Sequence, residues 1–287
     1  MNILVIGGSG LVGTNVVEAA EEAGDTVHAT YNTTECEHAE IRLDKTDQEQ
    51  TMEVICDLDP DVIVDTAAFH AVDDCETDRE HAWRVNATGT KNVAVAANNV
   101  DAHLVYVSTD YVFPGEPTTA PYCENDSVSP LNYYAETKYA GERAARIAGD
   151  ATILRTSVIY GLASENFVTW ALNELEASNE IQIVNDQVST ATYAPDLAKA
   201  CLAVAHGAHT GLYHASGPTA QSRFDFTRQL ADVCDYDPDL VTPISTEELG
   251  QEAPRPADGS LDSSLLYETI DYQFRDPASA FEVIRPW

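Results

Sequence analysis

Basic residues are scarce in this sequence, and long apolar runs are missing. The 287 residues include 15 lysines and arginines against 48 aspartates and glutamates, so the formal net charge is −33 at pH 7. Nucleic-acid binding depends on lysine and arginine, so this charge balance excludes a protein that binds the phosphate backbone. No run of about 18 apolar residues occurs, which excludes a membrane-spanning helix. No charged and then apolar leader precedes the first strand signal at Asn2, so we expect a cytoplasmic protein.

Cysteine is also sparse, and its spacing carries no metal signature. The six cysteines and eight histidines are scattered, with no CxxC pair and no Cys/His spacing typical of zinc. Hydrophobic residues make up 44% of the chain, which is enough to build a core without disulfides. We therefore expect reduced thiols, no metal site, and one large or two modest domains.

The acidic residues are spread along the whole chain and form no tail. At low salt, such a surface repels itself and destabilises the compact state. At about 1 M salt the screening length falls to roughly 3 Å, and this repulsion is weakened. We expect a halophilic protein, adapted to a salty cytosol. The alternative is an ordinary acidic protein.

Strand and helix signals alternate through the first half of the chain. Such alternation is typical of a parallel sheet covered by helices, which places the chain in the α/β class. After about Ser157 the same signals are spaced more loosely by loops containing glycine and proline. The predicted strands are Asn2–Ile6, Thr26–Tyr31, Val62–Thr66, His103–Ser108, Thr152–Thr156, Ile181–Val184 and Leu212–Ala215. The predicted helices are Leu11–Ala23, Asp47–Leu58, Glu76–Asn98, Tyr133–Ile147, Phe167–Ala177, Pro195–Ala205 and Arg223–Cys234.

The pattern predicts a doubly wound parallel sheet followed by a smaller C-terminal α/β lobe. We expect residues 1–157 to form a dinucleotide-binding domain, joined by returning segments near 185–205. Residues 158–184 and 206–287 are expected to form mainly a substrate-binding lobe.

A glycine-rich turn lies between the first predicted strand and the first predicted helix. Gly7, Gly10 and Gly13 follow the spacing G-x-x-G-x-x-G. Glycine lets the backbone approach a pyrophosphate, and the helix N-terminus offers free N–H groups to it. The turn therefore indicates a dinucleotide site, with a purely structural turn as the alternative. The second strand ends in Tyr31 and Asn32, with neither the acid nor the arginine that marks a ribose preference, so NADH and NADPH both stay open.

Tyr134 and Lys138 form a Y-x-x-x-K pair in a predicted helix. Residues four apart share one helix face. An ammonium beside a phenol favours the phenolate, and lowering the tyrosine pKa by about three units takes roughly 4 kcal/mol. Thr109 follows the fourth predicted strand, where ligands of open α/β sheets bind. Its hydroxyl can hold a substrate carbonyl against Tyr134.

With these elements in order, the chain resembles the extended short-chain dehydrogenase/reductase superfamily, and within it the dTDP-4-dehydrorhamnose reductase family. The specific carriers are the run S-T-D-Y-V-F at 108–113 and the run R-P-A-D-G-S-L-D at 255–262. The resemblance implies a Rossmann-like fold and an NADPH- or NADH-dependent reduction of the 4-keto group of a nucleotide-linked 6-deoxysugar.

The resemblance also implies roles for individual residues, carried over position by position. The implied catalytic residues are Thr109, Tyr134 and Lys138, and a superfamily asparagine that supports the proton relay corresponds to Asn86. The implied cofactor-binding residues are Gly7, Gly10, Leu11, Val12, Gly13, Asn32, Asp44, Lys45, Ala67, Ala68, Phe69, His70, Val107, Tyr134 and Lys138, with Asp44 and Lys45 by the adenine. The implied substrate-binding residues are Thr109, Asp110, Tyr111, Val158, Gln187 and Arg255.

Some positions depart from the family pattern. Val158 stands where the family usually has a sugar-contacting tryptophan, which leaves the exact substrate open. A diphosphate sugar approaching so acidic a chain needs a local cation, and Arg255 or Arg155 is expected to supply it; an ordinary ion pair is the alternative for each. A sugar-nucleotide 4-epimerase, or a non-enzymatic regulator resembling the methionine adenosyltransferase regulatory subunit, stays open beside the reductase. A homodimer is expected but left open.

Overall fold

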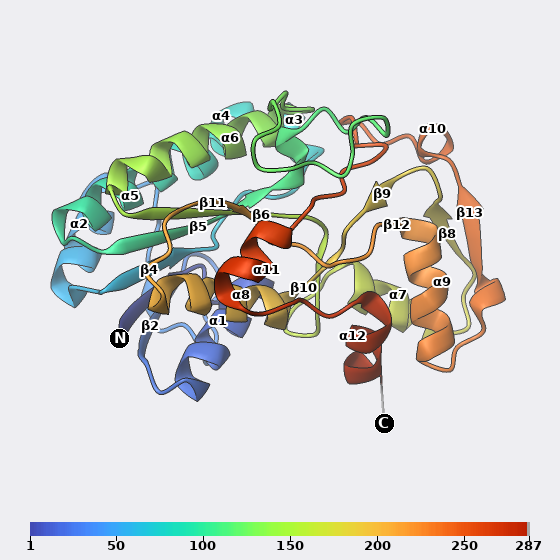
Figure 1. The fold of residues 1–287 in the computed structure, drawn as a ribbon, viewed down its shortest axis with the longest axis horizontal. Helices are drawn as coiled ribbons and strands as arrows, with labels where there is room; N and C mark the ends of the chain where they lie inside the picture. The colour runs from blue at the N-terminus through green and yellow to red at the C-terminus, as the bar shows by residue number, and fades with distance from the viewer. Residues whose placement is uncertain (286–287) are drawn as a thin grey trace.

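A seven-stranded parallel sheet forms the larger part of the molecule in the computed structural model, which describes residues 1–285 (Figure 1). The strand order is β11-β6-β5-β4-β1-β2-β3, so the connection reverses direction between β1 and β4. Ligands of open α/β sheets bind where the order reverses, at the carboxyl ends of the strands. The strands are β1 Asn2–Ile6, β2 Thr26–Tyr31, β3 Ile41–Arg42, β4 Val62–Asp65, β5 His103–Thr109, β6 Ala151–Thr156 and β11 Gly211–His214.

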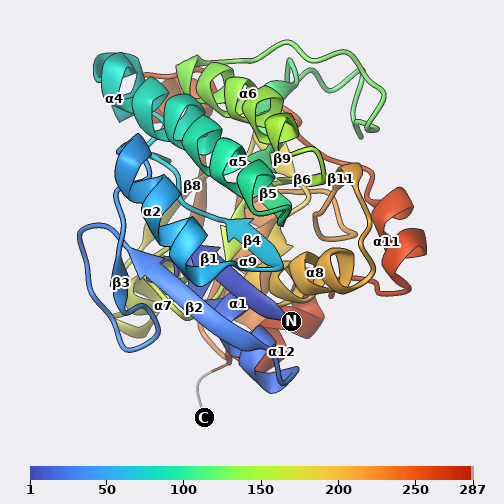
Figure 2. The same cartoon turned by 90° about the vertical axis from the view of Figure 1, so that its left-hand side faces the viewer.

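Helices cover both faces of this sheet, as expected for a doubly wound fold (Figure 2). The sequence of β1 is continuously apolar because its alternate residues point to opposite faces of the sheet, and both faces are covered by helices. Ile3 and Val5 enter the core beneath one helical layer, and Leu4 and Ile6 enter the core beneath the other. The first layer holds α1 Leu11–Glu22, α8 Ala194–His206 and α11 Ser264–Ile270, and the second holds α2 Gln48–Leu58, α5 Thr90–Asn99 and α6 Tyr133–Ala145.

The predicted helix Glu76–Asn98 is wrong as a single element. The chain breaks at Asp78, whose backbone leaves the helical region and whose carboxylate accepts a hydrogen bond from His81 N. A side chain that caps a new helix in this way ends the preceding one. The segment consists of α3 Asp74–Thr77, α4 Arg79–Trp83, a π-helical stretch Arg84–Gly89 and α5.

A second cluster of elements lies beyond the carboxyl ends of the sheet (Figure 1). Its core is aromatic: the ring of Phe226 lies 5.1 Å from that of Tyr160 and 4.9 Å from that of Phe281, centroid to centroid. The elements are β7 Ile159–Tyr160, α7 Phe167–Glu176, β8 Ile181–Val184, β9 Val188–Ser189, β10 Thr192–Tyr193, β12 Gln221–Ser222, α9 Arg223–Val233, β13 Val241–Ile244, α10 Thr246–Leu249 and α12 Pro277–Ile284. Short 3₁₀ segments lie at Asp110–Val112, Arg146–Ala148 and Pro238–Leu240.

The chain passes between the sheet and this cluster several times. β11 pairs with β6 at the edge of the central sheet, and α11 contributes Leu266 to the core shared with α8. These two elements differ from the expected division, which placed residues 206–287 mainly in the substrate lobe. None of the helices in the described residues is both long and apolar enough to cross a bilayer.

Candidate active site

The glycine turn brings the start of α1 against the end of β1. Gly7 has a φ of +87°, a conformation that favours glycine. A Cβ on Gly13 would lie 2.1 Å from the Gly7 carbonyl oxygen, so only glycine permits this approach. Gly10 is the N-cap and has no side chain to bond the first helical N–H groups. The N–H groups of Leu11 and Val12 are thus placed to bind an anion.

The loop after β4 is held from below by a buried ion pair. The Lys45 ammonium lies 2.9 Å from the Asp65 carboxylate and donates to the Ala67 carbonyl at 2.6 Å. A Cβ on Gly89 would lie 2.8 Å from the Lys45 side chain, so Gly89 makes room for it. The expected place of Lys45 by the adenine is therefore wrong for its ammonium, which is directed into the protein. Asp44 is half-buried and Asn32 is exposed.

Asn86 fixes the backbone of this same loop. Its side-chain oxygen accepts a hydrogen bond from Phe69 N at 2.8 Å, and its amide nitrogen donates to Phe69 O at 3.0 Å. The amide nitrogen also donates to Thr137 Oγ1 on α6 at 2.9 Å. Both amide hydrogens of Asn86 are used in this way, so the buried side chain ties residues 67–70 to the helix that carries Tyr134.

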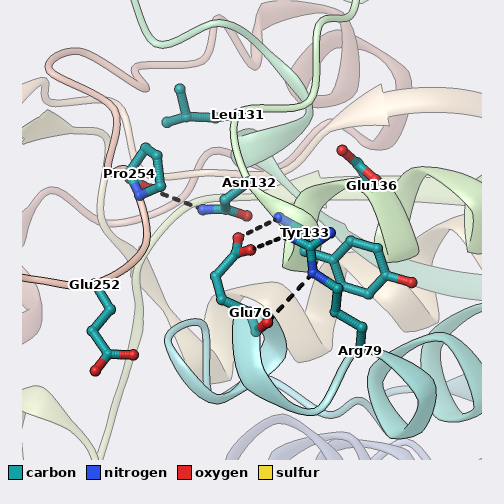
Figure 3. Close-up of a pocket in the computed structure, with 8 residues that line it drawn as sticks. All are labelled: Glu76, Arg79, Leu131, Asn132, Tyr133, Glu136, Glu252 and Pro254. Carbon is teal, nitrogen blue, oxygen red and sulfur yellow. Dashed lines mark hydrogen bonds and ion pairs between the residues drawn. The ribbon is translucent and has the colours of Figure 1, made fainter.

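The N-terminus of α6 is anchored by two side chains. Asn132 caps the helix by accepting from Ala135 N at 2.9 Å. Glu76 accepts from Tyr133 N at 2.8 Å, and its other oxygen accepts from Arg79 at 2.8 Å (Figure 3). A carboxylate at this end also complements the helix dipole. Tyr134 is the second residue of the helix, so these contacts lie directly beside it and fix its position.

The Lys138 ammonium points into the protein beneath the site. It donates to the Val107 carbonyl at 2.7 Å and lies 4.2 Å from the centroid of the Tyr106 ring. Burial, with a further contribution from Lys45, lowers the pKa of Lys138 to about 7. Tyr134 shows the opposite of the sequence expectation: burial, and then the nearby Asp110, raise its pKa well above the ordinary value of 10.0. Tyr134 is therefore a neutral phenol in this state, which is the form that can donate a proton.

Thr109 and Asp110 form a buried hydrogen-bonded pair at the end of β5. Thr109 Oγ1 donates to one Asp110 oxygen at 3.0 Å, and Ser157 Oγ donates to the other at 2.8 Å. Burial raises the pKa of Asp110 to about 6, although both hydroxyls oppose that shift. The Tyr111 ring meets the Tyr134 ring edge to face, with centroids 6.1 Å apart. Asp110 and Tyr111, both predicted to bind the substrate, thus lie beside Tyr134, the predicted proton donor.

A small cavity of about 10 Å³ opens beside Asp110, and this is room for about one water molecule. Val158, one of its lining residues, has a φ of +36°, which is unusual for a β-branched side chain. The lining brings together four of the predicted substrate residues with Arg223, which the sequence expectations did not include. The lining residues are Asp110, Tyr111, Val158, Gln187, Val188, Ser189, Arg223 and Pro256.

The two arginines expected to bind an anion are engaged in ion pairs instead. Arg255 donates to the Asp73 carboxylate at 2.8 Å and to the Ala253 carbonyl at 2.8 Å. Arg155 is buried, and two of its nitrogens donate to Glu142 at 2.8 Å each. Both arginines thus form the ion pairs that the sequence analysis gave as the alternative, and the role of Arg255 toward the substrate stays a prediction. One feature of the sequence could have pointed to Arg223. It lies in the first turn of a predicted helix, where the helix dipole disfavours positive charge.

A larger hollow of about 540 Å³ lies on the outer side of α6, lined by Tyr133 rather than Tyr134 (Figure 3). Here Asn132 donates to the Pro254 carbonyl at 3.0 Å. Together with the pair between Arg255 and Asp73, this bond ties the loop 253–259 to the N-terminal caps of α3 and α6. Within residues 1–285, no group of three or more His, Cys, Asp or Glu side chains is placed to hold a metal ion.

Comparison with known proteins places the whole chain in one family. The family model described as RmlD substrate binding domain matches residues 1–282. A dTDP-4-dehydrorhamnose reductase of Mycolicibacterium smegmatis is 34% identical over 258 residues, which is 89% of this chain and 76% of that protein. The "Probable low-salt glycan biosynthesis reductase Agl14" of Haloferax volcanii is 31% identical over 92% of this chain and 90% of that protein. The crystal structure of a dTDP-4-dehydrorhamnose reductase from Bacillus anthracis in complex with NADP superimposes with a TM-score of 0.91 at 31% identity, covering 98% of this chain and 97% of that chain.

Proposed function

This chain belongs to the RmlD family of extended short-chain dehydrogenase/reductases, and we propose that it reduces the 4-keto group of a nucleotide-linked 6-deoxysugar with NADPH or NADH. The specific reaction proposed is conversion of dTDP-4-dehydrorhamnose to dTDP-L-rhamnose. One observation carries the proposal: Thr109 and Tyr134 lie together at the carboxyl end of β5, and the buried Lys138 ammonium is held at the Val107 carbonyl of the same strand.

The residues around the glycine turn fit a dinucleotide. Uncapped N–H groups at the start of α1 suit the pyrophosphate, and the close approach at Gly13 leaves the turn bare of side chains. Asn32 and Asp44 would face the adenosine end, and the loop 67–70 held by Asn86 would line the ribose. No carboxylate directly follows β2 at residues 32–34, which is compatible with a 2′-phosphate. The nicotinamide, when bound, supplies the hydride.

The protein's own part in the reaction is to hold the ketone and give it a proton. Thr109 would bond the carbonyl oxygen, and the neutral phenol of Tyr134 would protonate the developing alkoxide. The Lys138 ammonium would stabilise the phenolate that is left behind. Asp110, Tyr111, Val158 and Gln187 would surround the sugar. Entry of the sugar requires movement of side chains around the small cavity beside Asp110.

The salt concentration at which the protein works, its oligomeric state and its location are separate questions from its reaction. We propose that it works at molar salt, because the net charge of −33 calls for screening. The homodimer and the cytoplasmic location expected from the sequence stay predictions.

The proposed reaction is tested by the stoichiometric loss of NADPH or NADH absorbance with dTDP-4-dehydrorhamnose at high KCl. We expect turnover, and we expect Tyr134→Phe to lose about 10²- to 10⁴-fold in kcat, as is typical for loss of a general acid. Tyr133→Phe is the matched control, because its ring lines the outer hollow. Equal activity of the two variants refutes the mechanism. Turnover without net cofactor oxidation indicates the epimerase, and no turnover with any 4-keto sugar nucleotide favours the regulator.

A further inference from the structure

The cations around the proposed site are almost all engaged by protein groups. A diphosphate approaching so acidic a chain needs a positive side chain that is free to meet it. Four cations near the site do not meet this need, because each already binds a protein group. These are Lys45 with Asp65, Lys138 with the Val107 carbonyl, Arg155 with Glu142, and Arg255 with Asp73.

Arg223 differs from these cations, because within residues 1–285 its guanidinium pairs with no carboxylate and its polar contact is with the Tyr111 hydroxyl. It is the first residue of α9, and its backbone N–H donates to the Gln187 carbonyl at 3.1 Å. Pairing of β12 with β9 holds this connection and brings the side chain to the cavity beside Asp110. The ion pairs among residues 1–285 do not include Arg223. Its guanidinium lies 5.3 Å from the centroid of the Phe167 ring, which supports the plane of the group.

The charge of Arg223 acts on two of the proposed substrate-binding residues. It lowers the pKa of both Asp110 and Tyr111, against the raising effect of burial on each. Asp110 already accepts hydrogen bonds from Thr109 and Ser157, so its carboxylate is satisfied without Arg223. The five N–H donors of a guanidinium in such a position suit a phosphate, which can accept two of them side by side.

We propose that Arg223 binds the diphosphate of the sugar nucleotide; this rests on the proposed function and names the ligand of its anionic half. In a hexose the 4-keto carbon and the carbon bearing the diphosphate lie on opposite sides of the ring. The residue that binds the diphosphate should therefore be separated from Tyr134 by about the width of a sugar ring. Tyr111 lies between the two, because its ring contacts Tyr134 and its hydroxyl is close enough to Arg223 for the guanidinium charge to lower its pKa.

The test is titration calorimetry with dTDP and with thymidine, at one fixed high KCl concentration. Arg223→Gln is expected to weaken dTDP binding on the order of 10- to 100-fold, the range for a charge-assisted hydrogen bond, and to leave thymidine and NADPH binding unchanged. Arg223→Lys keeps the charge without the planar fork, and should recover part of the loss. Arg228→Gln is the matched control, because it removes a cation from the same helix that pairs with exposed Asp239.

Three outcomes overturn the assignment. They are unchanged dTDP binding in Arg223→Gln, an equal loss in Arg228→Gln, and an equal loss of thymidine binding. In turnover, Arg223→Gln should raise KM for the sugar nucleotide and preserve most of kcat, because the contact persists in the transition state. Calorimetry with dTDP needs no turnover. Failure of the reductase assay alone therefore contradicts the proposed reaction and leaves the diphosphate site standing.

Discussion

At the scale of single residues, the site is built from groups whose ionisation is shifted by burial. Lys138 and Asp110 are both almost fully buried, and neither ammonium nor carboxylate has an oppositely charged group in direct contact. Lys138 has its pKa lowered to about 7, and Asp110 has its pKa raised to about 6. Each shift moves a group toward its neutral form and toward the pH range in which enzymes work.

The first prediction concerns the pH dependence of the proposed reaction. Below about pH 7 Lys138 is charged and can stabilise the Tyr134 phenolate; above it the charge is lost. Asp65 and Glu142 raise the pKa of Lys138, and Lys45 and burial lower it. We expect kcat/KM, which reports the free enzyme, to fall as the pH rises through about 7. In Lys138→Arg the charge persists, so this limb of the profile should disappear. A wild-type profile that is flat across this range contradicts the assignment.

The second prediction concerns stability and Asp110. The folded chain holds the Asp110 proton up to about pH 6, and the unfolded chain only up to its ordinary value of 3.8. Between these values the folded state binds more protons, so this carboxyl makes stability fall as the pH rises. Asp110→Asn should therefore gain stability relative to wild type between about pH 4 and about pH 7, on the order of 2–3 kcal/mol. Urea unfolding of wild type and Asp110→Asn at about pH 4 and about pH 7 measures this difference in the free energy of unfolding.

The control for Asp110 is an acid shifted the other way. Burial by itself raises the pKa of Asp186, but the hydrogen bonds that its carboxylate accepts from Thr246 together outweigh burial and lower the pKa below its ordinary value of 3.8. Asp186→Asn should therefore lose stability relative to wild type as the pH rises toward about 4, where the unfolded carboxyl ionises, and should change little above that. If both variants change in the same direction, the assigned ionisation of Asp110 is wrong.

At the scale of elements, α6 shows how distant segments position the catalytic side chains. Its N-terminus is held by Glu76 from α3, and its middle is tied to the loop after β4 through Thr137 and Asn86. Tyr134 lies between these two attachments. The hydrogen bonds of Glu76 and Asn86 should therefore resist small movements of the first two turns of this helix.

The third prediction follows from the anchor at Glu76. Glu76→Ala removes the acceptor for Tyr133 N and the partner of Arg79, so we expect a loss of about 1–2 kcal/mol in the free energy of unfolding and a lower kcat. Glu136→Ala is the control, because Glu136 lines the same hollow and lies on α6 itself. Equal effects of the two changes on stability and kcat show that the anchor has no special role.

The elements also show how far the sequence can be read. Strand Asn2–Ile6 was predicted to the residue because it is a continuous apolar run that the fold buries. Strand Thr26–Tyr31 was also predicted to the residue, although only Ala29 and Thr30 of it are buried. The two-residue strands β7, β9, β10 and β12 leave no periodic signal, since each depends on a partner distant in the chain. The Arg255 ion pair was missed for the same reason: Asp73 lies 182 residues away in sequence. Residue types that carry chemistry were recognisable, but their electrostatic partners were not.

At the scale of the whole molecule, the net charge of −33 is the dominant property. The 15 lysines and arginines are far fewer than the 48 acidic residues, and Lys45, Lys138 and Arg155 among them are buried. Repulsion among surface carboxylates opposes compactness at low salt and is weakened at high salt.

The fourth prediction is that the melting temperature rises when KCl is increased from about 0.1 M to about 3 M, because the Debye length falls well below the spacing of most surface charges. Differential scanning fluorimetry measures it. A protein of similar size with a net charge near zero is the control for effects of KCl on hydrophobic burial. A melting temperature that stays flat or falls counts against adaptation to salt.

The burial of Lys45 and Lys138 has a practical consequence for labelling. Only two of the four lysines, Lys91 and Lys199, are exposed. Amine-reactive dyes should therefore attach to the native protein at these two side chains and at the N-terminus. Lys91 lies on α5 and Lys199 on α8, on opposite faces of the central sheet. The lysines thus offer a natural pair of fluorophore positions across the sheet, while acylation of the two buried amines marks only molecules that have opened their core.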